Sequence, residues 1–274
     1  MCRQEWLEGL DPLNLVRAAR HYERASQILI REAVLSAREF ITTTPSLPAD
    51  ADAGAPSSTD NNWTVVEASA RIDLSGGWSD TPPIAYEHGG AVVNIALLVD
   101  GKRPIGAKVR RVQPASPGEL PRLTFVVYGS TVQTVHVETM RQLLTYHQPQ
   151  SPAALLKAAI CCAGLIDEAN PKSLAAQLSE RFGCGFEMHT WSDLPSGSGL
   201  GTSSILAGCA MAALWSTMGL SYDNSSLYHA VLHLEQMLTT GGGWQDQVRT
   251  RARVCMRYMF ACLHVCMLVI SCGN

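Results

Sequence analysis

The sequence has few charged and few aromatic residues. Only 16% of its 274 residues are Asp, Glu, Lys or Arg, 7% are aromatic, and the formal net charge is −3. Such a weak negative charge gives no reason to expect nucleic acid or an anionic membrane surface as a partner. The hydrophobic content of 46% is instead that of a globular protein with a substantial core.

Three further absences narrow the class of protein. The apolar part of the C-terminal tail, residues 258–272, is shorter than the ~20 residues of a membrane-spanning helix, and His264 interrupts it. No secretory signal peptide follows Met1. The nine cysteines include no CxxC pair. We therefore expect a cytoplasmic protein with reduced thiols and without a membrane partner.

The most distinctive stretch runs from Leu194 to Ser204 and reads Leu-Pro-Ser-Gly-Ser-Gly-Leu-Gly-Thr-Ser-Ser. An apolar run follows directly, so we predict a helix that begins near Thr202. Glycine lets the backbone approach a ligand closely, and a helix N-terminus attracts anions. The stretch therefore predicts a phosphate-binding loop, and an ordinary glycine-rich turn is the alternative.

Two familiar phosphate loops do not fit this stretch. A Walker loop ends in Gly-Lys-Ser/Thr, whereas Gly201 is followed by Thr202. The dinucleotide fingerprint is GxGxxG, whereas Gly197, Gly199 and Gly201 are spaced two and two. The prediction is a phosphate loop of another kind.

Composition divides the chain into four parts. A helical segment (1–41) and a disordered linker (42–62) precede a domain of strands and helices (63–248), and a Cys- and Met-rich tail (249–274) follows. The tail has no convincing helix or strand period. Unequal runs of strands and helices in the main domain indicate an α+β fold. We expect strands over 64–74, 91–99, 104–112, 123–128 and 185–191, and helices over 11–40, from Ser151-Pro152, over 173–182 and over 222–238.

Separate segments of the domain carry side chains suited to phosphoryl transfer. Ser203 and Glu235 offer the oxygen ligands that Mg²⁺ prefers. Asp246, in a second glycine-rich stretch, could accept the proton of an acceptor hydroxyl. Arg71 could hold that carboxylate ionised or offset charge on the phosphoryl group.

These side chains also have simpler interpretations. Arg71 could pair only with Asp73, two residues along the same strand. Asp80 precedes Thr-Pro, where an aspartate is commonly a turn residue. Glu235 could be a solvated carboxylate on a helix surface.

The set, in this order, resembles the GHMP kinases, the small-molecule kinases named for galactokinase, homoserine kinase, mevalonate kinase and phosphomevalonate kinase. Pro195–Ser203 matches the family's Pro-x-x-x-Gly-Leu-Gly-Ser-Ser, with Thr202 in place of the first serine. The stretch Arg71–Pro83 is similar to the version in the heptose-kinase and fucokinase branch, and Gly242–Gln247 looks like the loop with the catalytic aspartate. The resemblance covers residues 63–248 and lies nearest to the fucokinases.

The resemblance implies a fold and a set of roles. The fold would be the α+β amino-terminal lobe of a GHMP kinase, of the ribosomal protein S5 domain 2-like type, with the carboxy-terminal lobe largely missing. Asp246 would be the base with Arg71 as its partner, and Ser203 with Glu235 would hold Mg²⁺. Asp80, Gly242 and Gly243 would bind the sugar. The ATP phosphates would lie on Pro195, Ser196, Gly197, Ser198, Gly199, Leu200, Gly201, Thr202, Ser203 and Ser204.

The implied function is an ATP-dependent sugar 1-kinase that converts L-fucose to L-fucose 1-phosphate. The family's third motif, a C-terminal glycine-rich loop, has no counterpart here, so we expect a truncated form of such an enzyme, and whether it is active or inactive on its own stays open. Two alternatives stay open at this point. One is a GHMP kinase for a heptose or galactose, and the other is a protein that binds nucleotide or sugar without catalysis.

Overall fold

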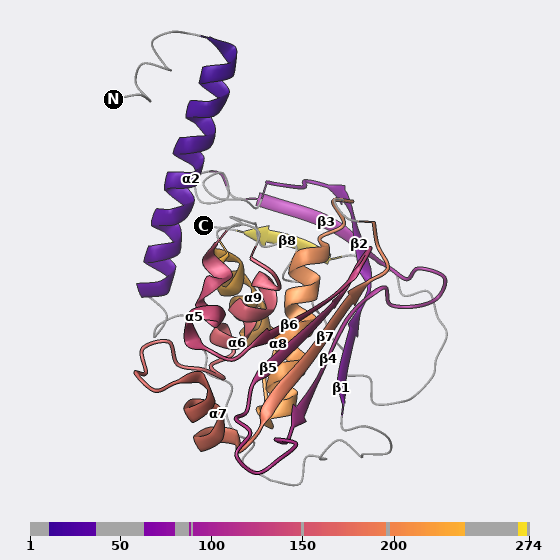
Figure 1. Cartoon of the computed structure of the whole chain (residues 1–274). Coiled ribbons are helices and arrows are strands. Elements are labelled where there is room, and N and C mark those ends of the chain that lie inside the picture. The colour runs from indigo at the N-terminus through magenta and orange to yellow at the C-terminus, as the bar shows by residue number, and fades with distance from the viewer. Residues whose placement is uncertain are drawn as a thin grey trace.

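The computed structural model describes residues 11–36, 63–79, 88, 90–148, 151–195, 198–238 and 268–272. In these residues, strands form two separate sheets (Figure 1). The larger sheet has the order β1-β4-β7-β5-β6, and the smaller has the order β2-β3-β8. The strands are β1 (Thr64–Ala68), β2 (Ala70–Ser75), β3 (Gly90–Leu97), β4 (Ile105–Val112), β5 (Leu123–Tyr128), β6 (Val132–Val137), β7 (Gly185–Ser192) and β8 (Leu268–Cys272).

Helices cover one face of the larger sheet, and one long helix projects from the lobe (Figure 1). The projecting helix is α2, which contacts the lobe through α9. None of the described helices is long and apolar enough to cross a bilayer. The helices are α2 (Pro12–Ser36), α5 (Met140–Leu143), the 3-10 turn η1 (Leu144–His147), α6 (Ala154–Cys162), α7 (Leu174–Phe182), α8 (Thr202–Met218) and α9 (Asn224–Met237).

The larger sheet alternates between a buried and a partly exposed face. On β4, Ile105, Ala107 and Val109 are fully buried against the helices, whereas Lys108 and Arg110 lie on the opposite face. This period of two is the pattern of a sheet that packs a core on one side only. Neighbouring strands are antiparallel except β5 and β7, which are parallel.

Helix α8 forms the centre of the core. Its residues from Ser204 to Trp215 are buried almost without interruption, apart from Leu206. The helix contacts β1, β4, α6 and α9. An apolar surface all round a helix is typical of a buried element. This burial fixes the position of the α8 N-terminus, where the glycine-rich stretch arrives.

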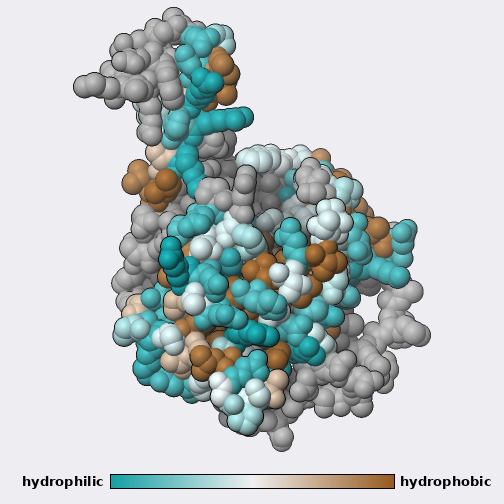
Figure 2. All heavy atoms as spheres, viewed as in Figure 1, coloured by the Kyte–Doolittle hydropathy of each residue, from teal (hydrophilic) through white to brown (hydrophobic). Residues whose placement is uncertain are grey.

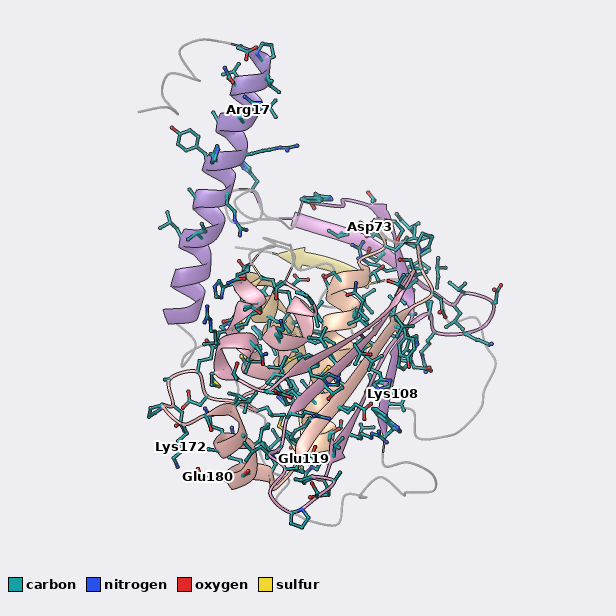
Figure 3. All side chains as sticks on the ribbon, in the orientation of Figure 1. Arg17, Asp73, Lys108, Glu119, Lys172 and Glu180 are labelled. Atoms are coloured by element: carbon teal, nitrogen blue, oxygen red, sulfur yellow. The ribbon has the colours of Figure 1, made fainter. Side chains whose placement is uncertain are left out.

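The outer face of the sheet carries a cluster of polar and aromatic side chains. Glu187 Oε2 accepts hydrogen bonds from Arg110 Nε and Nη2 at 2.8 and 2.5 Å. Glu187 Oε1 lies 2.8 Å from His189 Nε2. Arg110 also stacks on Trp63, with 4.5 Å from its Cζ atom to the ring centroid. Figure 3 shows Lys108, from the same face of β4, pointing away from the helices.

The structure confirms most of the predicted elements. The helix that begins near Thr202 is confirmed as α8, and the helix over 173–182 is confirmed as α7. The α+β fold class is confirmed as well. The linker predicted at 42–62 lies outside the described residues.

Three expectations for individual elements were wrong. The strand predicted over 64–74 is divided at Ser69 into β1 and β2, which belong to different sheets. The helix predicted from Ser151-Pro152 begins at Ala154, with Ala153 as an N-cap that makes no side-chain cap hydrogen bond. The tail, which showed no strand period, contributes Leu268–Cys272 as β8 beside β3. Strand β6 and helix α5 had not been predicted.

Candidate active site

The predicted phosphate loop joins the central strand of the larger sheet to the most buried helix. Strand β7 ends at Ser192, and α8 begins at Thr202 after Gly201 as its N-cap. Gly201 has φ +68° and makes no side-chain cap bond, and the first turn of α8 contains no acidic residue. The first N–H groups of an α-helix have no partner inside the helix, and the helix dipole is positive at this end. The loop and helix therefore present donors suited to an anion.

Space in front of the loop is open. Gly199 has φ +72°, and a Cβ atom built on it would meet no other atom within 4 Å. Of the loop residues that the structure describes, Pro195, Ser198 and Gly199 are exposed. The loop is accessible from solvent, as the binding site of a soluble phosphate compound must be.

A buried polar contact lies at the first turn of α8, directly after the loop in the sequence. Ser204, in the first turn of α8, donates a hydrogen bond from Oγ to Oε1 of Glu235, near the end of α9. The residues are only 5% and 6% exposed. Glu235 is therefore not the solvated surface carboxylate that its position on a helix had left open. A carboxylate is rarely buried unless it has partners.

Ser204, not Ser203, contacts Glu235. Ser203, predicted as the magnesium ligand beside Glu235, is exposed, and its role stays a prediction, whereas Ser204 is buried. Successive helical residues are rotated by about 100°, so only one of two adjacent serines can face α9. The motif spacing identified the pair of serines, but the direction in which each one points depends on how α8 packs.

Arg71 and Asp73 form an ion pair at the edge of the smaller sheet. Both belong to β2, and Arg71 Nη1 donates to Asp73 Oδ1. Residues two apart on a strand lie on the same face, which explains their contact. The Arg71 side chain is 5% exposed and that of Asp73 is 29% exposed. Figure 3 places Asp73 at the same end of the lobe as the loop between β7 and α8.

Several predicted site residues lie outside the described part of the chain. They are Asp80, Ser196, Gly197, Gly242, Gly243 and Asp246. The roles assigned to them, including the catalytic role of Asp246 and its pairing with Arg71, stay predictions.

The described residues thus define a class of protein. An open glycine loop leads into a buried helix of an α+β lobe, and a carboxylate contacts the first turn of that helix. This arrangement is suited to the binding of an anion at the α8 N-terminus. Residues 169–251 match the family described as GHMP kinases N terminal domain. The chain therefore contains a GHMP kinase N-terminal domain.

Two curated relatives extend the match towards the N-terminus. The chain is 38% identical over 180 residues to "L-fucokinase/L-fucose-1-P guanylyltransferase" of Bacteroides fragilis, which covers 65% of this chain and 18% of that protein. It is 34% identical over 185 residues to "Bifunctional fucokinase/GDP-fucose pyrophosphorylase" of Arabidopsis thaliana, which covers 68% of this chain and 16% of that protein. The chain spans less than a fifth of the length of these relatives.

Solved structures of GHMP kinases also resemble the lobe. One is a D-glycero-D-manno-heptose 1-phosphate kinase from Bacteroides thetaiotaomicron, 22% identical with a TM-score of 0.49, covering 67% of this chain and 52% of that one. Another is the mevalonate kinase of Methanococcus jannaschii, 12% identical with a TM-score of 0.48, covering 71% and 53%.

Proposed function

We propose that this chain carries the ATP-binding half of a sugar kinase that transfers the γ-phosphoryl group of ATP to the C1 hydroxyl of L-fucose. The observation that carries the proposal is the open loop at the α8 N-terminus with the contact between Ser204 and Glu235 at the first turn of that helix. The names of the two curated relatives support fucose as the acceptor sugar.

The residues present fit ATP with Mg²⁺. The N–H groups of the first turn of α8 would donate to phosphate oxygens. A buried carboxylate so close to a triphosphate would be repelled unless a cation lay between them, and Glu235 and Ser204 offer oxygen atoms for one. The described residues hold no group of three or more His, Cys, Asp or Glu side chains that could bind a metal by themselves. This suits a Mg²⁺ ion that takes its other ligands from phosphate and water.

The transfer itself requires a bond exchange at phosphorus and the loss of one proton. The sugar O1 atom forms a bond to the γ-phosphorus, the bond from that phosphorus to the bridging oxygen of ADP breaks, and the hydroxyl proton passes to a base. Mg²⁺, when bound, offsets the charge of the phosphate oxygens. We assign the base to Asp246, with Asp80, Gly242 and Gly243 at the sugar. The Arg71 guanidinium would offset negative charge that develops on the transferred phosphoryl group.

The first test is thermal unfolding of the chain with and without Mg-ATP and L-fucose. A ligand that binds only the folded state stabilises it by about 2.7 kcal/mol at one hundred times its Kd. We expect a cooperative transition whose midpoint rises with Mg-ATP and rises further with L-fucose. A midpoint that neither ligand moves contradicts the proposal.

Formation of fucose 1-phosphate then tests catalysis, and two variants separate the roles. Asp246→Asn should abolish turnover while the midpoint still rises with Mg-ATP. Glu235→Gln should weaken the rise with Mg-ATP and leave the smaller rise with ATP in EDTA unchanged. The matched control is Glu180→Gln, which changes an exposed carboxylate paired with Lys172 on the far side of the lobe (Figure 3). Parallel assays with a heptose and with galactose decide whether fucose is the preferred sugar.

A further inference from the structure

Trp78 is exposed to solvent in a turn directly after β2. Its exposed fraction is 73%, the largest among the exposed large apolar side chains that the structure describes. Transfer of a large aromatic side chain out of water lowers the free energy of the protein. An indole that is mostly exposed in the folded state therefore needs an explanation.

The backbone at Trp78 is strained. Its φ is +72°, a region that side chains other than glycine and asparagine rarely adopt. Backbone strain of this kind persists only where the surroundings enforce it, and it is frequent at ligand sites.

The surroundings do enforce the turn. Ser79 Oγ donates to the Gly76 carbonyl at 2.6 Å, and the Ala91 N–H donates to Ser79 Oγ at 3.1 Å. A Cβ atom on Gly76 would lie 1.9 Å from the Ala91 carbonyl oxygen, so only glycine allows this approach to β3. The turn is thus anchored to the neighbouring strand on both sides of Trp78.

The same turn folds back onto the Arg71–Asp73 ion pair. A Cβ atom on Gly77 would lie 3.0 Å from Asp73 Oδ2, so the backbone just before Trp78 touches this carboxylate. The Asp73 side chain is 29% exposed. The backbone that carries the exposed indole therefore lies against a partly exposed carboxylate at the end of β2.

We propose that Trp78 is the platform on which the acceptor sugar stacks. A pyranose has hydroxyl groups at its rim and C–H groups on its faces, and a 6-deoxyhexose adds a methyl group. The carboxylate of Asp73 can accept hydrogen bonds from the rim, and the indole can pack against an apolar face. The ligand class is a sugar with an apolar face, and the role of Trp78 is selection and orientation of that sugar. This inference rests on the proposed sugar kinase function.

The test compares Trp78→Ala with Trp78→Phe in the full chain and measures L-fucose and Mg-ATP binding separately by calorimetry. Loss of an aromatic contact of this kind should weaken L-fucose binding about tenfold in Trp78→Ala, and Trp78→Phe should recover most of it. The Kd of Mg-ATP should stay unchanged in both variants. Leu120→Ala, which removes a side chain that is 69% exposed in another loop, is the matched control and should change neither Kd.

Tryptophan fluorescence gives a second measurement. The chain has six tryptophans. The difference between the fluorescence of the wild type and that of Trp78→Phe gives the contribution of Trp78. L-Fucose should change that contribution in the wild type, and the change should be missing in Trp78→Phe although the sugar still binds.

Each remaining outcome is decisive. If the wild type binds ATP and L-fucose and Trp78→Ala binds the sugar equally well, the platform is overturned while the proposed function stands. The exposed indole then fits a contact with another protein. If the wild type binds Mg-ATP but not L-fucose, the platform is overturned together with the assignment of fucose as the acceptor. If the wild type binds neither ligand, the proposed function fails and the platform fails with it.

Discussion

Ser204, in the first turn of α8, and Glu235, in the last turn of α9, form a side-chain contact between the two helices. Ser204→Ala removes a hydroxyl that donates to a carboxylate with 6% exposure. A buried acceptor that loses a donor costs about 1–3 kcal/mol of stability. We expect a loss of this size in urea unfolding without ligands. Ser203→Ala, one residue earlier and exposed, is the control and should cost less than about 0.5 kcal/mol. Equal losses of unfolding free energy in the two variants would mean that the contact between Ser204 and Glu235 does not stabilise the packing of α8 against α9.

Lys157 is a buried ammonium group with hydroxyl partners. It is 4% exposed, and Nζ donates to Thr145 Oγ1 at 2.9 Å and to Ser151 Oγ at 3.1 Å. Burial lowers the pKa of Lys157 below its usual value of 10.5. The folded state then binds fewer protons than the unfolded state in the alkaline range, so this group makes the protein more stable as the pH rises through its folded pKa towards 10.5.

Lys157→Met should remove that alkaline rise. The thioether side chain fills similar volume without a charge, so stability at pH 7 should be equal to or above that of the wild type. The measurement is the urea midpoint between pH 7 and 10. Lys172→Met, at an exposed lysine paired with Glu180, should keep the wild-type pH dependence. A marked loss of stability at pH 7 in Lys157→Met would show that the hydrogen bonds outweigh the cost of burying the charge.

At the scale of single elements, the start of α6 is strained. Its N-cap residue, Ala153, has φ +53° and ψ +34° and makes no side-chain cap hydrogen bond. A left-handed conformation costs an alanine about 1–2 kcal/mol relative to glycine. Ala153→Gly should therefore stabilise the protein by about 0.5–1 kcal/mol in thermal or urea unfolding. Ala154→Gly, one residue further and inside the helix, should destabilise it by about 1 kcal/mol. A change of stability with the same sign in both variants would contradict backbone strain at Ala153.

Local patterns predicted an element well where local chemistry decides it. Helix α7 has Ser173 as its N-cap and Gly183, with φ +65°, as its C-cap, and both signals are visible in the sequence. The helix expected from Ser151-Pro152 is present as α6, but its predicted start was wrong for a non-local reason. The Ser151 hydroxyl bonds Thr145 and Lys157, so it does not cap a helix, and the helical turns start three residues later.

The same distinction applies to the sheets and to the site. The break at Ser69 separates β1, which pairs with β4, from β2, which pairs with β3. The sequence of a short segment does not show which distant strand it will pair with, so this break was not predictable. The loop and its helix were predictable because glycine spacing and an apolar run lie within one stretch. The contact of Glu235 with Ser204 and not with Ser203 was not predictable, because it depends on the packing of α8 against α9. The contact between Arg71 and Asp73 follows from strand geometry, whereas the pairing of Arg71 with Asp246 stays a prediction.

At the scale of the whole molecule, acid should weaken the sheet through Glu187. Burial raises the pKa of this carboxyl group, but the hydrogen bonds from His189 and Arg110 lower it by more, so the net pKa lies below its usual value of 4.5. A lowered folded-state pKa adds stability above pH 4.5 that is lost as the pH falls through the folded pKa.

Glu187→Gln should therefore be less stable than the wild type at pH 7, and the difference should shrink below pH 4.5. The measurement is the urea midpoint from pH 7 to pH 3. Glu180→Gln again serves as the control, because its carboxylate is 54% exposed in a surface ion pair. A difference between Glu187→Gln and wild type that is constant with pH would point to lost packing rather than to the ion pair.

The strand that leads into the phosphate loop is also the middle strand of its sheet. Strands β4 and β5 are synthesised long before β7, yet they are not neighbours, and the place between them stays vacant until β7 is made. Entry of β7 thus completes the sheet and delivers the loop in one event, and Glu235 arrives on α9 only after that. Contacts between distant parts of a chain form slowly. On a nascent chain at the ribosome, the proposed nucleotide site would therefore be complete only after almost the whole lobe had emerged.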